Sequence, residues 1–232
     1  LYYFTAALNK GLGIESSELD RITLRLLPMI ASVGLLLFLL ALMRATSLTT
    51  LLGSAFVALS PLPVIYGAYF VQEALFVLIG FFLLYSYFNF WDRQTAIRAA
   101  IVGLWTGVFF ATKETAIIHV AGIALTVLIA FPPSRILDSW RSAARFPNLA
   151  AGFGSFALIW IFFYSGGFKD FGQLGDSFKA FINYAERSQG AGHEKPFFYY
   201  LSIMWPHTAE GVRWGEALFL FLSFAGLIAA LA

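Results

Sequence analysis

The sequence contains no cysteine and little charge, and these two absences set the first limits on the protein. Without cysteine the chain forms no disulfide and no thiolate metal site, and its redox compartment is left open. Only 12% of its 232 residues are charged, whereas soluble globular chains are about one quarter charged. The net charge of +2 is small and spread along the chain, which argues against a nucleic-acid partner because such partners need clustered basic residues.

Apolar residues are present in excess: 59% of the chain is hydrophobic, and 26 residues are Phe. Several apolar runs approach the roughly 20 residues that a helix needs to cross a bilayer. We therefore predict an all-α, polytopic transmembrane helix bundle in the plasma membrane. No repeat of fixed period is evident, so residues 1–232 are predicted to form a single membrane domain. We expect neither a cofactor nor a metal. The sequence begins without Met and ends inside an apolar run, and we expect a fragment that lacks an N-terminal span and a C-terminal part.

The apolar runs also predict where helices begin and end. Strong spans are predicted at Leu26–Met43, Ala74–Phe90 and Leu149–Tyr164, a shorter one at Leu51–Leu59, and an incomplete one from Trp214. The double proline of SPLP (60–63) should end a helix, because proline removes a backbone donor. The run 99–131 would be roughly 50 Å long as one helix, so two short helices meeting at Lys113 and Glu114 fit a bilayer better.

The loops predict an orientation. The short loops near Arg44, around Arg93 and in the basic segment 132–147 should be cytoplasmic, because basic residues favour that side. Alternation then places the first 25 residues, the turn before Glu73, the Lys113 junction and the polar stretch 165–213 on the extracytoplasmic face. Within that stretch, apolar residues at helical spacing predict a short amphipathic helix over Phe178–Arg187.

Glu73 is the first candidate for a functional site. It lies at the membrane entrance of a strong predicted span, directly after the double-proline turn. Ionisable groups in or near the apolar layer are costly and usually face a cavity or a partner. A carboxylate at a helix start is also stabilised by the helix dipole alone, and the sequence does not separate these two interpretations.

Three cations are candidates for binding a phosphate. Lys113 lies between two apolar runs that are each short for a span, and a lysine ammonium there suits a phosphate, although a lysine that only reaches the interface would look the same. Arg21 and Arg25 lie one turn apart at the outer start of the first span. Interfacial anchoring explains Arg21 equally well, whereas Arg25 lies one turn deeper.

His193 is the remaining candidate, in the segment GHEKPFFYYL. A histidine in a loop is more often solvated than functional, and with His207 it makes no metal site without a further ligand at suitable spacing. We keep it as a candidate for substrate contact.

Taken in order, four passages resemble the GT-C membrane glycosyltransferases of the protein O-mannosyltransferase and aminoarabinose transferase type, in a bacterial or archaeal branch. They are LYYFTAALNKGLGIESSELDRITLRLLP, SPLPVIYGAYFVQEAL, GLWTGVFFATKET and HEKPFFYYL. The resemblance implies an inverting transfer of a sugar from a polyprenyl-phosphate donor on the extracytoplasmic side. It implies an acidic catalytic base in a first outer loop, which would lie before Leu1. It also implies that Glu73 lines the active-site cavity, and that Arg25 and Lys113 neutralise the donor phosphate.

Other classes of function remain open. A transporter or flippase that moves lipid-linked sugars also needs charge near broken helices, although such proteins often contain a repeated half, which is not visible here. A non-catalytic partner of such a machine and a structural membrane subunit are further alternatives.

Overall fold

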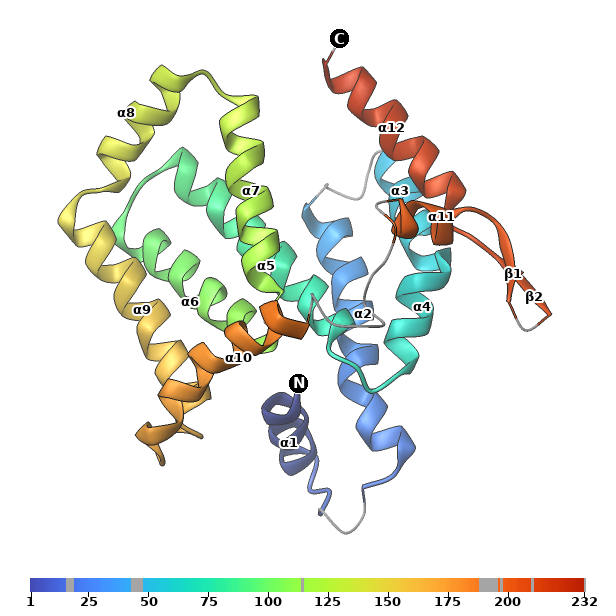
Figure 1. The fold of residues 1–232 in the computed structure, drawn as a ribbon, viewed down its shortest axis with the longest axis horizontal. Helices are drawn as coiled ribbons and strands as arrows, with labels where there is room; N and C mark the ends of the chain where they lie inside the picture. The colour runs from blue at the N-terminus through green and yellow to red at the C-terminus, as the bar shows by residue number, and fades with distance from the viewer. Residues whose placement is uncertain are drawn as a thin grey trace. The chain divides into compact units, whose positions relative to one another are not determined.

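The computed structural model describes residues 1–15, 19–42, 48–113, 115–187, 196, 198–209 and 211–231. The helices are α1 (Tyr2–Gly11), α2 (Arg21–Leu42), α3 (Leu48–Leu59), α4 (Pro61–Ala68), α5 (Glu73–Asp92), α6 (Ala96–Thr112), α7 (Ala116–Ala130), α8 (Pro133–Ala143), α9 (Phe146–Tyr164), the 3-10 turn η2 (Phe171–Gln173), α10 (Leu174–Arg187), α11 (Tyr199–Met204) and α12 (Ala217–Leu231). An antiparallel hairpin of β1 (His207–Ala209) and β2 (Val212–Trp214) lies between α11 and α12 (Figure 1). Apart from this hairpin, the regular structure of the described residues is helical, as the sequence predicted.

Three of the described helices are long and apolar enough to cross a membrane. They are Arg21–Ala41 of α2, Glu73–Asp92 (α5) and Phe146–Tyr164 (α9). These are the three strong spans that the sequence predicted, each within a few residues of its predicted bounds. Three shorter helices, α6, α7 and α12, are also apolar. The chain is thus a helical membrane protein by the length and composition of its helices.

The chain divides into two compact units. The central unit contains Leu75–Arg187 together with Leu1. The flanking unit combines Tyr2–Ala74 with Ser188–Ala232, so it contains segments from both ends of the sequence.

The central unit is held together by the close packing of α6 against α9, which run side by side in Figure 1. Glycine makes this approach possible: a Cβ atom on Gly103 would overlap the carbonyl oxygen of Gly152. One turn further along α6, a Cβ on Gly107 would lie 2.8 Å from the side chain of Ile159. The hydroxyl of Ser155 donates a hydrogen bond of 2.8 Å to the carbonyl of Ala100. Small residues and interhelical hydrogen bonds are the usual means of helix association in lipid.

Hydrogen bonds of polar side chains connect the loop before α6 with α8 and with the beginning of α9. The amide of Gln94 donates to the Ser139 hydroxyl at 2.7 Å, and the buried Asn148 donates to the Gln94 carbonyl at 3.4 Å. Ser139 belongs to α8, which connects α7 to α9. These contacts give α8 a fixed place at the beginning of α9.

In the flanking unit, α2 packs against α3 and α4. Pro28 lies inside α2 and is fully buried, although proline usually breaks a helix interior. The close approach of α4 to α2 occurs at Gly67, where a Cβ would lie 2.6 Å from the Ser32 hydroxyl. Small residues therefore also allow the close approach in this unit, because Gly67 meets Ser32, and Ala31 of α2 is almost completely buried.

The structure shows which of the predicted helix breaks and loops are present. The run 99–131 is two helices, α6 and α7, with the break at the predicted place. The double proline does end α3, but α4 then begins at Pro61, and proline is well tolerated in a first helical turn. The predicted amphipathic segment Phe178–Arg187 forms the larger part of α10. The basic segment 132–147, predicted as a loop, instead contains the amphipathic α8, whose Ile136 is buried.

Candidate functional site

The first turn of α2 is fixed by a capping arrangement. The carboxylate of Asp20 accepts hydrogen bonds from the backbone amides of Ile22 at 2.9 Å and Thr23 at 2.8 Å. In return, the Thr23 hydroxyl accepts from the Asp20 amide at 2.9 Å. These bonds satisfy donors that a helix start leaves unpaired, and they hold α2 in position just before Arg25. Hydrogen bonds from the Thr23 backbone, and next from its side chain, lower the pKa of Asp20.

Arg25 lies where an apolar cavity of the flanking unit meets exposed polar surface. Its guanidinium carbon is 5.8 Å from the centre of the Tyr69 ring, within the range of a cation–π interaction. The cavity of about 270 Å³ is lined by α2, α3 and α4, and Arg25 is the only charged residue among those that line it. The other lining residues are Met29, Ser32, Val33, Leu35, Leu36, Val57, Ala58, Val64, Gly67 and Ala68. An exposed cation beside an apolar cavity can bind an amphiphile whose head carries negative charge.

Glu73 is the first residue of α5 and lies four residues after Tyr69. Its side chain is half-buried, and its Oε2 atom is completely buried. The helix dipole favours a carboxylate at this position. The structure therefore brings Arg25 onto the turn that leads to Glu73, within one unit.

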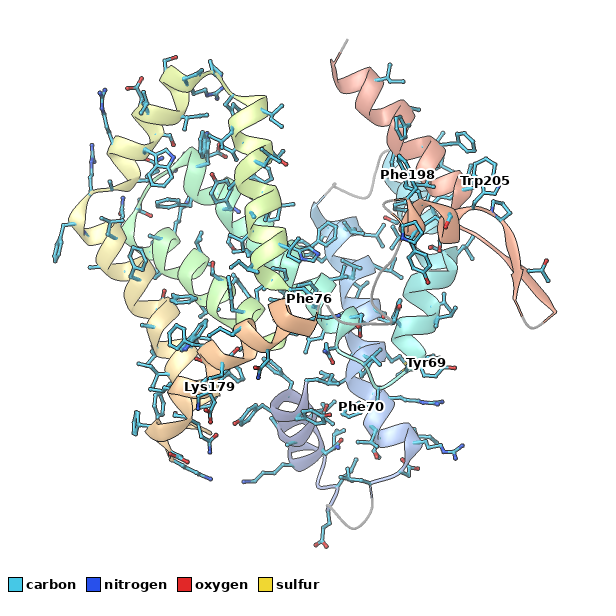
Figure 2. The ribbon with its side chains drawn as sticks, in the orientation of Figure 1. Tyr69, Phe70, Phe76, Lys179, Phe198 and Trp205 are labelled. Carbon is cyan, nitrogen blue, oxygen red and sulfur yellow. The ribbon has the colours of Figure 1, made fainter. Side chains whose placement is uncertain are left out.

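Helix α1 packs near the same turn. The ring of Tyr2 meets the edge of Phe70, with 5.8 Å between ring centres, and Figure 2 shows Tyr69 and Phe70 following α4. Asn9 of α1 is buried, and no described residue forms a hydrogen bond with its side-chain oxygen. Asn9 and Tyr69 were not singled out from the sequence, since neither an isolated amide nor an aromatic residue is distinctive there.

Lys113 lies in the central unit, in the break between α6 and α7. Its backbone is extended, with φ −158° and ψ 139°, so it terminates α6 and its side chain is half-buried. Its carbonyl accepts a hydrogen bond from Ala116 at 3.1 Å, which closes the turn into α7. The predicted helix break at Lys113 is thus present, while its neighbour Glu114 lies outside the described residues.

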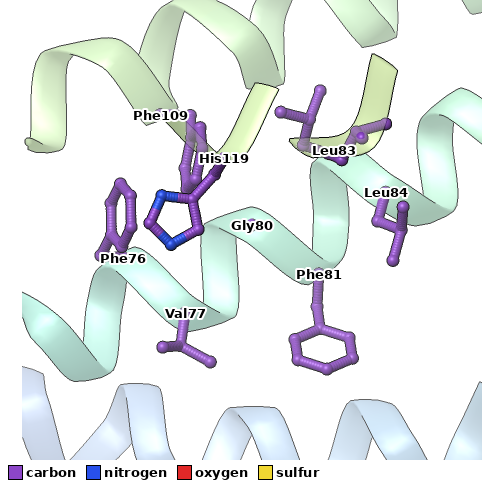
Figure 3. Close-up of a pocket in the computed structure, with 9 residues that line it drawn as sticks. Phe76, Val77, Gly80, Phe81, Leu83, Leu84, Phe109 and His119 are labelled. Carbon is purple, nitrogen blue, oxygen red and sulfur yellow. The ribbon is translucent and has the colours of Figure 1, made fainter. Parts of the chain in front are cut away.

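A second apolar cavity, of about 230 Å³, begins one turn before Lys113 (Figure 3). Phe76 and Phe109 stack in its wall with 4.2 Å between ring centres, and His119 meets the edge of Phe76 at 5.0 Å. The His119 Nδ1 atom is 3.1 Å from the Thr115 carbonyl, and since a carbonyl only accepts, this nitrogen carries the proton. His119 is the one polar side chain among the residues that line this cavity.

Among the predicted site residues that the structure describes, only Arg25 and Glu73 lie in the same unit. Arg25 and Glu73 lie in the flanking unit, Lys113 lies in the central unit, and His193 lies outside the described residues. Within the parts of the chain that are described, no group of three or more His, Asp or Glu side chains could hold a metal ion.

One buried acid was missed by the sequence reasoning. Glu216 precedes α12, is 6% exposed, and accepts a hydrogen bond of 2.7 Å from the hydroxyl of Ser60. This bond joins two segments that are 156 residues apart in the sequence. A single acid before an apolar run resembles an ordinary helix start, so its burial was not predictable from local sequence.

No protein-family model, no curated protein and no solved structure matches this chain. The fold and composition of the chain define its class, a helical membrane protein.

Proposed function

We propose that this chain is part of a polytopic GT-C-type glycosyltransferase of the plasma membrane, which transfers a sugar from a polyprenyl-phosphate donor to an acceptor on the extracytoplasmic side. The observation that supports the proposal best is Arg25, which lies at one end of an apolar cavity and against Tyr69. A lipid phosphate combines a long apolar chain with an anionic head, and this site offers a surface for each.

The chemistry of sugar transfer fits such a site. When the sugar leaves the donor, negative charge builds on the lipid phosphate, and a fixed cation stabilises that charge. Arginine suits this role because its planar guanidinium donates two parallel hydrogen bonds to phosphate oxygens. In this proposal Arg25 and Lys113 neutralise the phosphate, Glu73 lines the active-site cavity, and His193 contacts substrate.

The test compares two arginines on one helix. In full-length protein reconstituted in nanodiscs, binding of polyprenyl phosphate is measured for the parent, Arg25→Gln and Arg21→Gln. Arg25→Gln should weaken binding about tenfold or more, because a hydrogen bond to a charged group contributes about 1.5–3 kcal/mol. Arg21 begins α2 but does not line the cavity, so Arg21→Gln should bind like the parent.

A further variant tests whether Lys113 contributes to binding or turnover of the donor. Lys113→Met keeps most of the apolar stem without the charge, and it should weaken binding or turnover of the sugar-loaded donor by about 1.5–3 kcal/mol. Equal binding by Arg25→Gln and Arg21→Gln would contradict the role of Arg25. Donor binding with sugar-lipid movement across the bilayer, but without sugar transfer, would favour a transporter.

A further inference from the structure

Helix α8 combines an apolar face with a basic one, at the end of a membrane span. Ile136 is buried within the central unit, whereas Leu137 is 56% and Trp140 66% exposed. Trp140 also lines, with Ile136, a cavity of about 330 Å³ between α8 and the helices α5, α6 and α7. Arg135 is exposed on the opposite face, and the exposed Arg141, four residues after Leu137, borders the apolar face. An apolar stripe with Trp and Leu that is bordered by arginines is typical of helices that lie in the plane of a membrane surface.

The position of α8 agrees with this pattern. It ends at Ala143, just before α9 begins at Phe146, and α9 is long and apolar enough to cross the membrane. The beginning of a spanning helix lies at the membrane surface, and the contacts of Gln94 with Ser139 and Asn148 keep α8 there. Figure 1 shows α8 as the connection between α7 and α9. Trp140 is thus at the depth where tryptophan is enriched in membrane proteins.

The charge balance of residues 132–147 favours anionic lipid. Residues 132–147 contain three arginines, Arg135, Arg141 and Arg145, and a single acid, Asp138. The ion pair between Arg141 and Asp138 is long, at 3.4 Å, and both side chains are more than 70% exposed, so it neutralises little of this charge. Arg135 also stacks on Phe131, with 5.1 Å from its guanidinium carbon to the ring centre, which holds it near the beginning of α8.

We propose that α8 is an in-plane membrane-surface helix that binds the headgroups of anionic phospholipids through Arg135, Arg141 and Arg145. Its apolar edge, Leu137 and Trp140, enters the boundary between headgroups and acyl chains. Basic residues near a membrane attract anionic headgroups, and this attraction falls off within a Debye length. The proposal is independent of the proposed sugar transfer, since it concerns the loop that the sequence places on the cytoplasmic side.

Helix α10 provides a matched control inside the same unit. It is also amphipathic and follows the other end of α9, with Phe178 and Ile182 exposed. Its charges balance, however, because Asp176 and Glu186 oppose Lys179 and Arg187. Lys179 is moreover paired with Asp176 at 2.7 Å. Both helices should therefore lie at a membrane surface, but only α8 should prefer anionic lipid.

The absence of cysteine allows a direct test with single labels. Leu137→Cys, Asp138→Cys and Ile182→Cys are each labelled in the full-length protein and reconstituted in nanodiscs. A nitroxide at 137 should be shielded from a water-soluble relaxation agent, whereas one at 138 should be accessible. A fluorophore at 137 should be quenched about twofold more by brominated phosphatidylglycerol than by the same fraction of brominated phosphatidylcholine, whereas a fluorophore at 182 should be quenched equally by both.

Arg135→Gln combined with Arg141→Gln should remove the excess quenching at 137 while leaving the depth of the label unchanged. Three results would overturn the proposal. In the first, position 137 is as accessible to water as position 138. In the second, the fluorophore at 137 shows no preference for the anionic lipid. In the third, it is shielded from both water and lipid quenchers, which would mean that protein covers this edge.

Discussion

Two regions of the molecule are built from apolar helices but pack in different ways. One is the pair formed by α6 and α9, and the other is the group formed by α2, α3 and α4. In the pair, backbone meets backbone at Gly103 and Gly152, and Ser155 bridges the helices. In the group, one close approach at Gly67 leaves a cavity of about 270 Å³ beside Arg25. A cavity of about 380 Å³ also borders the pair, but none of the residues that line it is charged. The two regions therefore differ in charge, because the cavity of the group has Arg25 in its lining.

This difference distinguishes the region that we propose binds the donor lipid from the region that supports the fold. Lipid tails are as apolar as leucine, so helices in a membrane associate through close packing rather than through escape from water. The α6–α9 pair has that packing and supports α8 and α10 at its ends. The α2–α4 group combines its cavity with the cation of Arg25, and a lipid with an anionic head needs both.

The largest expected effect comes from closing the gap between α6 and α9. Gly103→Ala should lower the free energy of unfolding by about 1–3 kcal/mol, because the new Cβ overlaps the backbone of Gly152 and neither helix can yield cheaply. Thermal unfolding in detergent, followed by circular dichroism, measures the change. The control is Gly154→Ala on α9, where a Cβ meets no atom within 4 Å. A Gly103 variant as stable as the Gly154 variant would contradict the packing described here.

The next effect tests the cavity of the α2–α4 group. Ala58→Leu should partly fill it and weaken polyprenyl-phosphate binding about fivefold, or on the order of 1 kcal/mol. The loss should be modest because a displaced chain enters lipid rather than water, so mainly packing contacts are lost.

Ala55→Leu is the control for this experiment, since Ala55 is exposed on the same helix but does not line the cavity. Both variants should keep the parent's thermal stability. If Ala55→Leu and Ala58→Leu bind the lipid equally, the cavity is not the binding surface.

The sequence predicts the helices of this protein better than the contacts between them. The spans around α2, α5 and α9 and the break at Lys113 follow from hydrophobic length and from one charged interruption, which are local properties. The helix α8 was predicted as a loop because its eleven residues include two arginines and an aspartate. Its helical character depends on burial of Ile136, which is a tertiary contact.

The candidate site shows the same division. Arg25, Glu73 and Lys113 were chosen because charge beside an apolar run is unusual, and that signal is visible in the sequence. The contact of Arg25 with Tyr69 and the bond from Ser60 to Glu216 join segments far apart in the chain. Nothing local to any of these residues indicates its partner.

A smaller effect is expected from the hydroxyl that bridges α6 and α9. Ser155→Ala removes the hydrogen bond to Ala100 and should cost about 0.6 kcal/mol, the average for such bonds between membrane helices. Thr126→Val is a suitable control, because its hydroxyl bonds only within its own helix, to the carbonyl of Gly122 at 2.8 Å. Unfolding in mixed micelles should detect the difference. An equal loss in both variants would mean that the bridge adds nothing beyond local helix effects.

The smallest expected effect concerns the beginning of α2, which is capped by Asp20, whereas the beginning of α6 has no side-chain cap at Thr95. The pKa of Asp20 in the folded protein lies below its ordinary value of 3.8, chiefly because of the Thr23 backbone hydrogen bond. A lowered pKa means that the cap stabilises the fold fully above pH 3.8, and that this contribution is lost as the pH falls through the lower folded value. The melting temperature of the parent should therefore fall more steeply under acid than that of Asp20→Asn, while Asp92→Asn, at the exposed end of α5, should follow the parent. Parallel pH profiles for the parent and Asp20→Asn would show that this cap does not contribute to the stability of α2.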